Sequence, residues 1–352
     1  MMRNCGKACG ILFVSVFIVS ATAAQDVKRS ARTLIVWGSL DGALQDNGLP
    51  PSWKSYPAGF EGYDCYTVQQ PHRSAPRSLR MAAEVPWASV IMPSQQPLAP
   101  GTRQAGRGWA KVAGETSGEA VLRIDYLDEN GKFLGQALPA ILPANAERGD
   151  GWKLLAVEGT ADLYPKATSF QLVAAVRGGG TVYWDDFDLK AFPESTVPNL
   201  LKNPGFEWVA GDKFPGWNLF TTEAQRMALR PAVQQVHDGW ISVQLTGEAK
   251  AAVLSAGRFP VEAGRNYHLE GWHRALQGGG RFKLVFWNGS EHVVTLRTTA
   301  PAANTWSKCE TLVATPVQFS KATHVTVEYE VNGVFDVLLD AVRFWSEPTP
   351  GQ

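Results

Sequence analysis

The sequence predicts an all-β protein made of two copies of one antiparallel sandwich. Two observations support this prediction. Short apolar runs are separated by Gly, Pro, Asn and Asp, and no long segment repeats apolar residues at the three- and four-residue steps of a helix. Several motifs of the first half of the chain also recur in the second half, which is the signature of a duplicated domain.

Strands are indicated by stretches in which apolar and polar residues alternate. Three clear examples are residues 120–126, 281–287 and 325–331. In the second of these, Phe282 and Phe286 fall on the same side of the predicted strand. Such alternation is typical of a half-buried strand in an antiparallel sheet, with one side in the core and the other in water.

The internal repeat is visible as paired motifs at similar spacing. The pairs are residues 68–72 with 233–237, residues 97–109 with 260–272, residues 166–168 with 321–323, and residues 183–189 with 338–344. Trp109 and Trp272 are 163 residues apart, whereas Trp152 and Trp306 are 154 apart. The first copy therefore has about nine additional residues, which we expect in a lengthened surface loop within residues 128–151.

The length of 352 residues suits two domains of ordinary size. We predict a first domain over residues 33–192 and a second over residues 199–347. The Pro-containing stretch 193–198 is the predicted linker between them.

The N-terminus has the three parts of a secretory signal peptide over residues 1–24. Arg3 and Lys7 come first, residues 11–19 are apolar, and residues 21–24 are small. The apolar run is short for a membrane span, although an uncleaved anchor stays open as an alternative. We therefore expect a secreted protein that is extracellular, periplasmic or bound at the cell surface, with no membrane span after cleavage.

The composition narrows the function classes. Basic and acidic residues number 33 each, which argues against a general nucleic-acid binder. The 13 tryptophans exceed what two modest cores need, so we expect some of them to face solvent or a ligand. Cys65 and Cys309 lie in different halves, and two buried free thiols are the favoured interpretation over an inter-domain disulfide.

The second half resembles a known family of domains. Residues 199–207 (Asn-Leu-Leu-Lys-Asn-Pro-Gly-Phe-Glu) with Trp217, residues 267–273 and residues 339–344 resemble the carbohydrate-binding modules first described in cellulases of the CenC type. The second half covers this pattern from end to end, and the first half matches it at its middle and close. The resemblance implies two galactose-binding-like jelly rolls, each of two antiparallel sheets with a face for sugars.

The same resemblance implies a structural calcium ion between the first and last strands of a module. In the second half its carboxylate ligands would be Glu207 and Asp340, completed by backbone carbonyl groups. The counterparts in the first half are Asp41 and Asp185. The alternative is that these acids cap turns or form ion pairs.

Sugar binding requires aromatic faces beside hydrogen-bonding groups. Alternation along residues 267–274 places Glu270, Trp272 and Arg274 on the outward face of a strand, and we expect Trp287 beside them. The predicted carbohydrate-binding residues are Trp272, Trp287, Glu270 and Arg274 in the second domain and Trp109 and Arg107 in the first. The alternative is that loops or the other domain cover these tryptophans.

Catalysis finds little support in the sequence. No His-Glu-x-x-His or Gly-x-Ser-x-Gly motif occurs, and the glycine triplets precede strands rather than helices. We therefore predict a secreted, non-catalytic protein whose two modules bind poly- or oligosaccharide with avidity, with a separate glycoside hydrolase as a partner. Two alternatives stay open: a structural or adhesive surface protein without a sugar site, and a glycan hydrolase or lyase.

Overall fold

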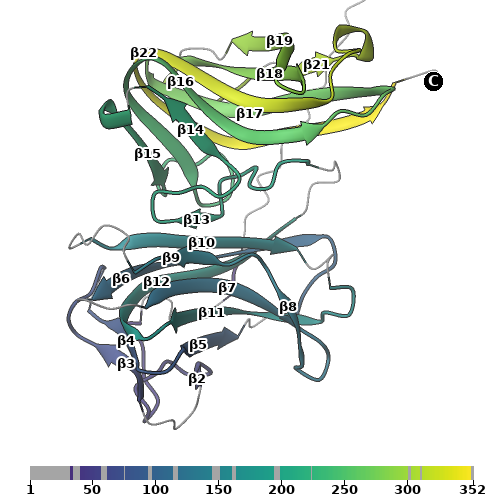
Figure 1. Cartoon of the computed structure of the whole chain (residues 1–352). Helices are drawn as coiled ribbons and strands as arrows, with labels where there is room; N and C mark the ends of the chain where they lie inside the picture. The colour runs from purple at the N-terminus through teal and green to yellow at the C-terminus, as the bar shows by residue number, and fades with distance from the viewer. Residues whose placement is uncertain are drawn as a thin grey trace, which may run out of the picture. The chain divides into compact units, whose positions relative to one another are not determined.

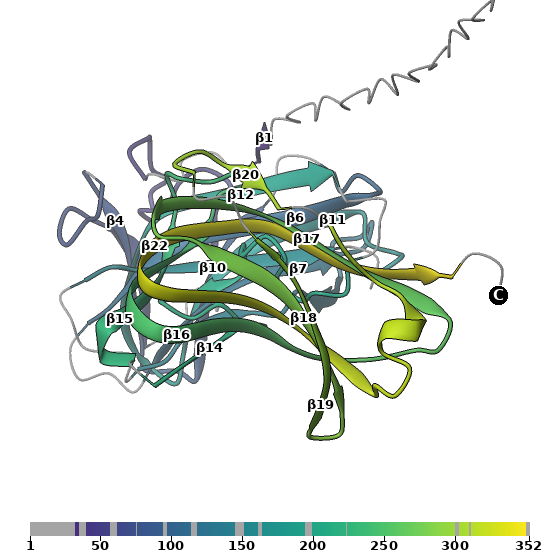
Figure 2. The same cartoon turned by 90° about the horizontal axis from the view of Figure 1, so that it is seen from above.

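Antiparallel strands make up nearly all of the regular structure (Figures 1 and 2). The computed structural model describes residues 32–34, 40–56, 62–74, 76–93, 97–113, 118–144, 151–160, 164–193, 199–222, 224–299, 303–309 and 311–349. The predicted signal peptide and residues 194–198 of the predicted linker lie outside these residues. Contacts group residues 31–352 into one unit. In the described part of the chain, no helix has the length and apolar character needed to cross a membrane.

The first half forms two sheets. Its strands are β1 (Arg32–Thr33), β2 (Lys54–Tyr56), β3 (Tyr63–Val68), β4 (Ser78–Ala83), β5 (Trp87–Pro93), β6 (Thr102–Ala113), β7 (Glu119–Leu127), β8 (Phe133–Gln136), β9 (Ala140–Leu142), β10 (Lys153–Thr160), β11 (Ser169–Arg177) and β12 (Gly180–Pro193). One sheet has the order β13-β10-β6-β12-β4-β3, with β1 beside β12, and its strand β13 (Val209–Ala210) comes from the second half. The other has the order β2-β5-β11-β7-β8, with β9 beside β7.

The second half forms one long, folded sheet. Its strands are β13 (Val209–Ala210), β14 (Asn218–Thr221), β15 (Met227–Ala232), β16 (Ser242–Pro260), β17 (Arg265–Gln277), β18 (Gly280–Asn288), β19 (Glu291–Thr299), β20 (Ser307–Lys308), β21 (Leu312–Ala314) and β22 (His324–Pro348), with short 3₁₀ helices η2 (Ala224–Arg226) and η3 (Pro316–Gln318). The exception is β13, which pairs with β10 of the first half.

The two sheets of the first half face each other across a core. Gly106 of β6 lies so close to the side chain of Leu172 of β11 that a β-carbon there would be 2.4 Å from its Cδ1 atom. The hydroxyl of Tyr126 on β7 donates to Oε1 of Gln104 on β6 at 2.9 Å. The first half is therefore the predicted antiparallel sandwich.

The second half reaches the same arrangement because two strands run through both of its layers. The first part of β22, up to Val331, pairs with β18, and the part from Asp336 onward pairs with β17. β16 accompanies β22 from Val243 to Pro260. The layer that contains β17 and the layer that contains β18 are thus joined by the long β16–β22 ribbon (Figure 2).

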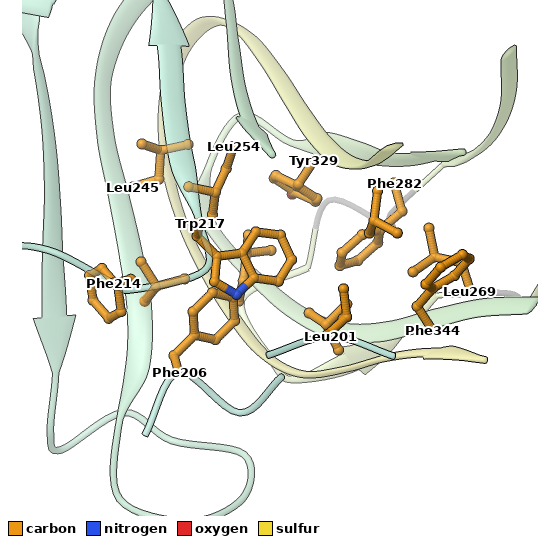
Figure 3. Close-up of a cluster of buried hydrophobic side chains, with 14 of the residues drawn as sticks. Leu201, Phe206, Phe214, Trp217, Leu245, Leu254, Leu269, Phe282, Tyr329 and Phe344 are labelled. Atoms are coloured by element: carbon orange, nitrogen blue, oxygen red, sulfur yellow. The ribbon is translucent and has the colours of Figure 1, made fainter. Parts of the chain in front are cut away.

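The inward faces of these two layers form the second core. Tyr267 of β17 and Phe286 of β18 have ring centroids 6.2 Å apart. Figure 3 shows Leu269, Phe282 and Tyr329 from both layers gathered in this cluster. Burial of Phe282, Phe286 and Tyr329 confirms the alternation predicted for residues 281–287 and 325–331.

The two halves share unusual local features, as a duplication requires. Leu40 and Phe206 both have positive φ, 63° and 58°. Leu40 precedes Asp41 and Phe206 precedes Glu207, the two acids that the sequence matched as counterparts. Trp53 and Trp217 are both buried, and each donates its backbone N–H to the carbonyl three residues earlier, at 3.1 and 2.9 Å. The openings of the two halves therefore have the same backbone geometry, which agrees with the predicted correspondence of Asp41 and Glu207.

The prediction of a lengthened surface loop within residues 128–151 is wrong for its first part. Residues 133–136 and 140–142 are the strands β8 and β9, which pair with β7 and extend the sheet. The reversal before β8 is fixed by Asp128, whose Oδ1 accepts the backbone N–H groups of Asn130 and Lys132, both at 2.9 Å. Residues 145–150 lie outside the described residues.

Cys65 and Cys309 are free thiols, as predicted, but only Cys309 is also buried as predicted. Cys65 is half-buried and Cys309 is buried, and burial raises the pKa of each thiol to about 12. Both groups are therefore protonated at neutral pH and poor nucleophiles.

Replacing Gly271 by Ala tests the packing of β17 against β18. The new β-carbon would lie 2.7 Å from Cζ of Phe282, inside the second core. We expect a loss of about 1–3 kcal/mol in the free energy of unfolding, measured by urea denaturation, because overpacking forces a core ring from its position. The control is Gly151→Ala, where no atom lies within 4 Å of the new group. Equal stability of both variants would contradict the face-to-face packing.

Candidate functional site

A buried carboxylate on the closing strand anchors a loop in the second half. Asp340 of β22 is fully buried, and its Oδ2 accepts the backbone N–H groups of His237 and Asp238 at 2.8 and 3.0 Å. Its Oδ1 accepts the N–H of Ala341 at 2.7 Å. Three backbone donors thus fix the loop that leads into β16 onto the surface of β22.

The first half repeats this arrangement. Oδ2 of Asp185 accepts the N–H groups of Arg73 and Ser74 at 2.8 and 3.3 Å, and Oδ1 accepts the N–H of Asp186 at 2.8 Å. His237 and Arg73 are therefore structural counterparts, each held by its backbone.

The side chain held in this way covers a tryptophan in both halves. The ring of His237 stacks on Trp272 with centroids 3.7 Å apart and planes inclined by 19°, and Trp306 lies 5.9 Å from His237. In the first half the Arg73 guanidinium lies 3.8 Å above the ring of Trp109. One ring face of each tryptophan is thus occupied by the chain itself.

Outward side chains of β17 and their neighbours form a polar and aromatic surface, which we call the β17 face. It comprises His268, Glu270, Trp272 and Arg274 of β17, Lys308 of β20, and Arg343 and Trp345 of β22. The face therefore contains three of the predicted sugar-binding residues, Glu270, Trp272 and Arg274.

Glu270 is the central acid of the β17 face. Its carboxylate lies 2.9 Å from the amine of Lys308 and 3.2 Å from the guanidinium of Arg343. The Arg343 guanidinium in turn lies 5.4 Å from the centroid of the Trp345 ring. The ring of His268 stacks on Trp345, with centroids 4.9 Å apart and planes inclined by 9°. Ion pairs and stacking thus join Glu270 to a second aromatic ring that sequence reasoning did not select.

Arg274 occupies the other end of the β17 face. Its Nε and Nη2 donate to Oδ1 of Asn304 at 3.1 and 3.0 Å, and its Nη1 donates to Oε1 of Gln235 at 3.3 Å. In the described part of the chain no ion pair is found for this guanidinium. Neutral amide oxygens therefore hold it in place.

Trp287 does not belong to this face, so the prediction of one platform containing Trp272 and Trp287 is wrong. Trp287 is on β18, and its Nε1 lies 3.3 Å from Oγ1 of Thr326 on the first part of β22. The inward faces of β17 and β18 pack against each other, so their outward residues lie on opposite sides of the sandwich. Alternation identified Trp287 as outward but could not assign its layer.

The predicted site of the first half contacts the second half. Arg107 lies 3.8 Å from Asp188, and its guanidinium is 5.0 Å from the ring of Trp240, which also has the amine of Lys190 at 4.5 Å. Trp109 is half-buried and packs against the apolar cluster that forms the second core. In the first half, therefore, the other domain covers Trp109, as the alternative interpretation of the sequence expected.

Glu207 and Asp340 form the candidate metal site. Both are buried, and burial raises the pKa of Asp340 to about 8 and that of Glu207 well above its usual range. Arg103 offsets part of this rise in the pKa of Glu207, and the nearby Asp340 carboxylate adds to it. Oε1 of Glu207 accepts the N–H of Trp240 at 2.7 Å, whereas its buried Oε2 has no partner. Two neighbouring buried acids and one unpaired oxygen fit a hard cation.

The remaining predicted metal ligands fit less well. Asp185 is buried, but Asp41, the counterpart of Glu207, is exposed. Within the described residues no group of three or more His, Cys, Asp or Glu side chains is placed to hold a metal ion. Any cation at Glu207 and Asp340 would therefore depend on backbone oxygen ligands as well.

The solved structures similar to this chain include carbohydrate-binding modules, and also enzymes such as an α-L-arabinofuranosidase and the enzymatically active domain of a bacteriophage tailspike protein. The tandem family 22 modules of Xyn10C from Paenibacillus barcinonensis cover 91% of this chain and 98% of their own, with 10% identity and a TM-score of 0.36. The module TmCBM61, solved with β-1,4-galactotriose, covers 43% of this chain and 100% of its own, with 18% identity and a TM-score of 0.31. A family 16 module covers 44% and 98%, with 18% identity and a TM-score of 0.31.

No protein-family profile matches the chain, and no curated protein matches it. The strand order and the facing sheets described above establish the sandwich fold independently of these similarities.

Replacing Asp340 by Asn tests the anchoring of the loop. An amide has one acceptor oxygen, so its NH₂ group would face a backbone N–H that the carboxylate now accepts. We expect a loss of about 1–3 kcal/mol in the free energy of unfolding, measured by urea denaturation in chelator at a pH of about 9, above the pKa of about 8 of the Asp340 carboxyl. Asp336→Asn is the control, because Asp336 accepts a single side-chain bond, from Gln244 at 2.8 Å. Equal effects of both substitutions would argue against the anchor.

Proposed function

We propose that this protein is a secreted, non-catalytic glycan-binding protein that binds its ligand on the β17 face of the second half. The observation that supports this proposal is the grouping of Trp272 and Trp345 on one face with Glu270, Arg274 and Arg343. Sugar rings pack their C–H groups on aromatic faces while their hydroxyls bond to charged and amide groups.

The geometry favours a rigid site of this kind. The side chains stand on paired strands, and each aromatic ring is fixed by a stacked neighbour, His237 for Trp272 and His268 for Trp345. A ring that is held before the ligand arrives loses less conformational entropy on binding.

A single site fits the structure better than two sites acting with avidity. In the first half Arg107 and Lys190 lie against Trp240, and Ala105 and Leu154 belong to the second core cluster. The face that would bind sugar there is engaged by the chain itself. We therefore assign the first half a structural role. For this half, the proposal agrees with the alternative of a structural protein without a sugar site.

The carboxylates of the β17 face support binding rather than hydrolysis. Glu270 is paired with Lys308 and Arg343, and Glu347, further along β22, lies 2.9 Å from Nε2 of His268. Glycoside hydrolysis needs one acid free to protonate the leaving group and a second across the bond. A separate glycoside hydrolase as a partner remains part of the proposal.

Substituting the aromatic residues tests the binding face. We expect Trp272→Ala and Trp345→Ala each to weaken binding to the best glycan of an array by more than about tenfold, since aromatic anchors carry most of the energy of such sites. Affinity electrophoresis or calorimetry measures the change. Trp287→Ala, on the opposite side, should bind as the wild type does. If Trp287→Ala lost binding while Trp272→Ala and Trp345→Ala kept it, the binding site would lie on the β18 layer instead.

We also propose that Glu207 and Asp340 hold a structural calcium ion, with backbone carbonyls as further ligands. The unpaired Oε2 of Glu207 and the raised pKa values of both acids support this proposal. The ion would supply positive charge to two carboxylates that are otherwise buried close together. We do not extend the proposal to Asp41 and Asp185, because Asp41 is exposed.

Calcium removal tests this site. Calcium at a hundred times its dissociation constant should stabilise the wild type by about 2.7 kcal/mol relative to chelator. Glu207→Gln should abolish this response, yet in chelator it should be at least as stable as the wild type, because it removes a buried carboxyl group whose charge Arg103 offsets only in part. The control, Glu248→Gln, changes an exposed acid and should keep the response. Equal melting temperatures of the wild type with calcium and with chelator would contradict the proposal.

A further inference from the structure

Arg274 joins two loops that come from distant parts of the second half. Its Nη1 donates to the side-chain oxygen of Gln235 at 3.3 Å, in the loop between β15 and β16. Its Nε and Nη2 donate to Oδ1 of Asn304 at 3.1 and 3.0 Å, in the loop before β20, and Nε also lies 3.2 Å from the main-chain carbonyl oxygen of Asn304. One guanidinium therefore fastens both loops to β17.

Each of these loops brings an aromatic ring, two residues after the amide side chain that Arg274 holds. The rings belong to His237 and Trp306, and their centroids are 5.9 Å apart. His237 also stacks on Trp272, with centroids 3.7 Å apart. Trp272 itself lies two residues before Arg274 on the same face of β17. The two fastened loops thus add two rings to the one that β17 supplies.

Trp306 is held at this face without being part of either core. The residue is half-buried, and in the described part of the chain it is not among the partly buried apolar residues that pack against the two core clusters. Trp109 of the first half, by contrast, packs against the second core. A large aromatic side chain that is held in place at the surface is suited to contact a ligand.

The two copies differ at the position of Arg274. Lys111 occupies it in the first half, two residues after Trp109. A lysine has one amine on a flexible stem, whereas the planar guanidinium presents donors in a fixed fork that reaches two loops at once. The group over the ring of Trp109 is the guanidinium of Arg73 rather than a second aromatic ring. The arrangement around Trp272 is therefore not a general requirement of the fold.

Resting on the proposed glycan binding, we infer that Trp306 is a further ligand-contacting residue of the β17 face and that Arg274 is its positioning residue. The glycan contacts Trp306 as well as Trp272. Arg274 acts mainly through the loops, to which it directs three of its five N–H groups. Loops that are fastened before the glycan arrives lose less conformational entropy on binding.

The experiment measures binding of the mature protein to soluble polysaccharides by affinity electrophoresis. The probes are xylan, galactan, mixed-linkage β-glucan and galactomannan, which differ in sugar and linkage, and a glycan array supplies the probe if none of the four is bound. We expect Trp306→Ala to weaken binding to the tightest-bound probe about tenfold, as loss of an aromatic anchor does. Trp287→Ala, on the opposite side of the sandwich, is the control and should bind as the wild type does.

Variants of Arg274 test its positioning role. Arg274→Gln should weaken binding about tenfold, and Arg274→Lys should not restore it, because an amine keeps the charge and loses the fork. Combined with Trp306→Ala, Arg274→Gln should cost much less than the product of the two single losses, since both remove the same contact. The matched control is Arg265→Gln on the same strand, because Nε and Nη2 of Arg265 also donate to a single neutral residue, Ser346, at 2.9 and 3.0 Å.

Hydrogen exchange without glycan gives a readout that does not depend on binding. Arg274→Gln should speed amide exchange in residues 233–237 and 303–306 about tenfold, while the core strands keep their protection. Gln235→Ala and Asn304→Ala remove only the acceptors, so each should release its own loop and weaken binding without any change to β17. These two variants keep the test valid if the substitutions of Arg274 impair folding.

The outcomes separate this inference from the proposed function. Unchanged affinity of Trp306→Ala, while Trp272→Ala loses binding, overturns the inference and leaves glycan binding standing. Multiplicative losses in the double variant, wild-type affinity of Arg274→Lys, or unchanged exchange in both loops overturn the positioning role of Arg274. Binding that neither Trp272→Ala nor Trp306→Ala weakens, or no binding to any probe, overturns the proposed function and the inference together.

Discussion

The structure around the candidate site depends on one buried carboxylate in each closing strand. Asp340 and Asp185 each accept three backbone N–H groups, two of them from a loop that is more than 100 residues away in sequence. A carboxylate can serve this many donors because both of its oxygens accept. The bonds fix the path of the loop, and the path determines which side chain lies over the tryptophan of the neighbouring strand. Asp340 thereby places His237 on Trp272.

The two copies keep this frame and differ in the side chains that surround it. Ala105, Leu154 and Phe192 of the first copy belong to the apolar cluster of the second core. Their counterparts in the second copy are His268, Lys308 and Glu347, which are polar and half-buried or exposed. Apolar residues on an outward face bury area against another part of the chain, whereas polar residues keep the face hydrated. Duplication thus produced one docking face and one face suited to a polar ligand.

The sequence predicted the strands and their inward residues well, because alternation reports burial directly. It could not predict the layer of an outward residue: β17 and β18 are consecutive, yet they join different layers, so Trp272 and Trp287 separate. The alignment of the two copies by sequence was also wrong by one residue in the loop that contains His237. Residues 68–72 and 233–237 match by letters, which pairs His72 with His237, but the hydrogen bonds to Asp185 and Asp340 pair Arg73 with His237. Backbone bonding fixes this register, and side-chain identity does not.

The loop between β15 and β16 connects the two candidate sites. Asp340 holds its first part at His237, and Glu207 holds its second part through the backbone N–H of Trp240. The side chains of these two residues then point to different surfaces: His237 to Trp272 on the β17 face, and Trp240 to Arg107 and Lys190 of the first half. Because the same two acids are the candidate calcium ligands, a cation between them would stabilise the binding face and the contact between the halves through one short segment.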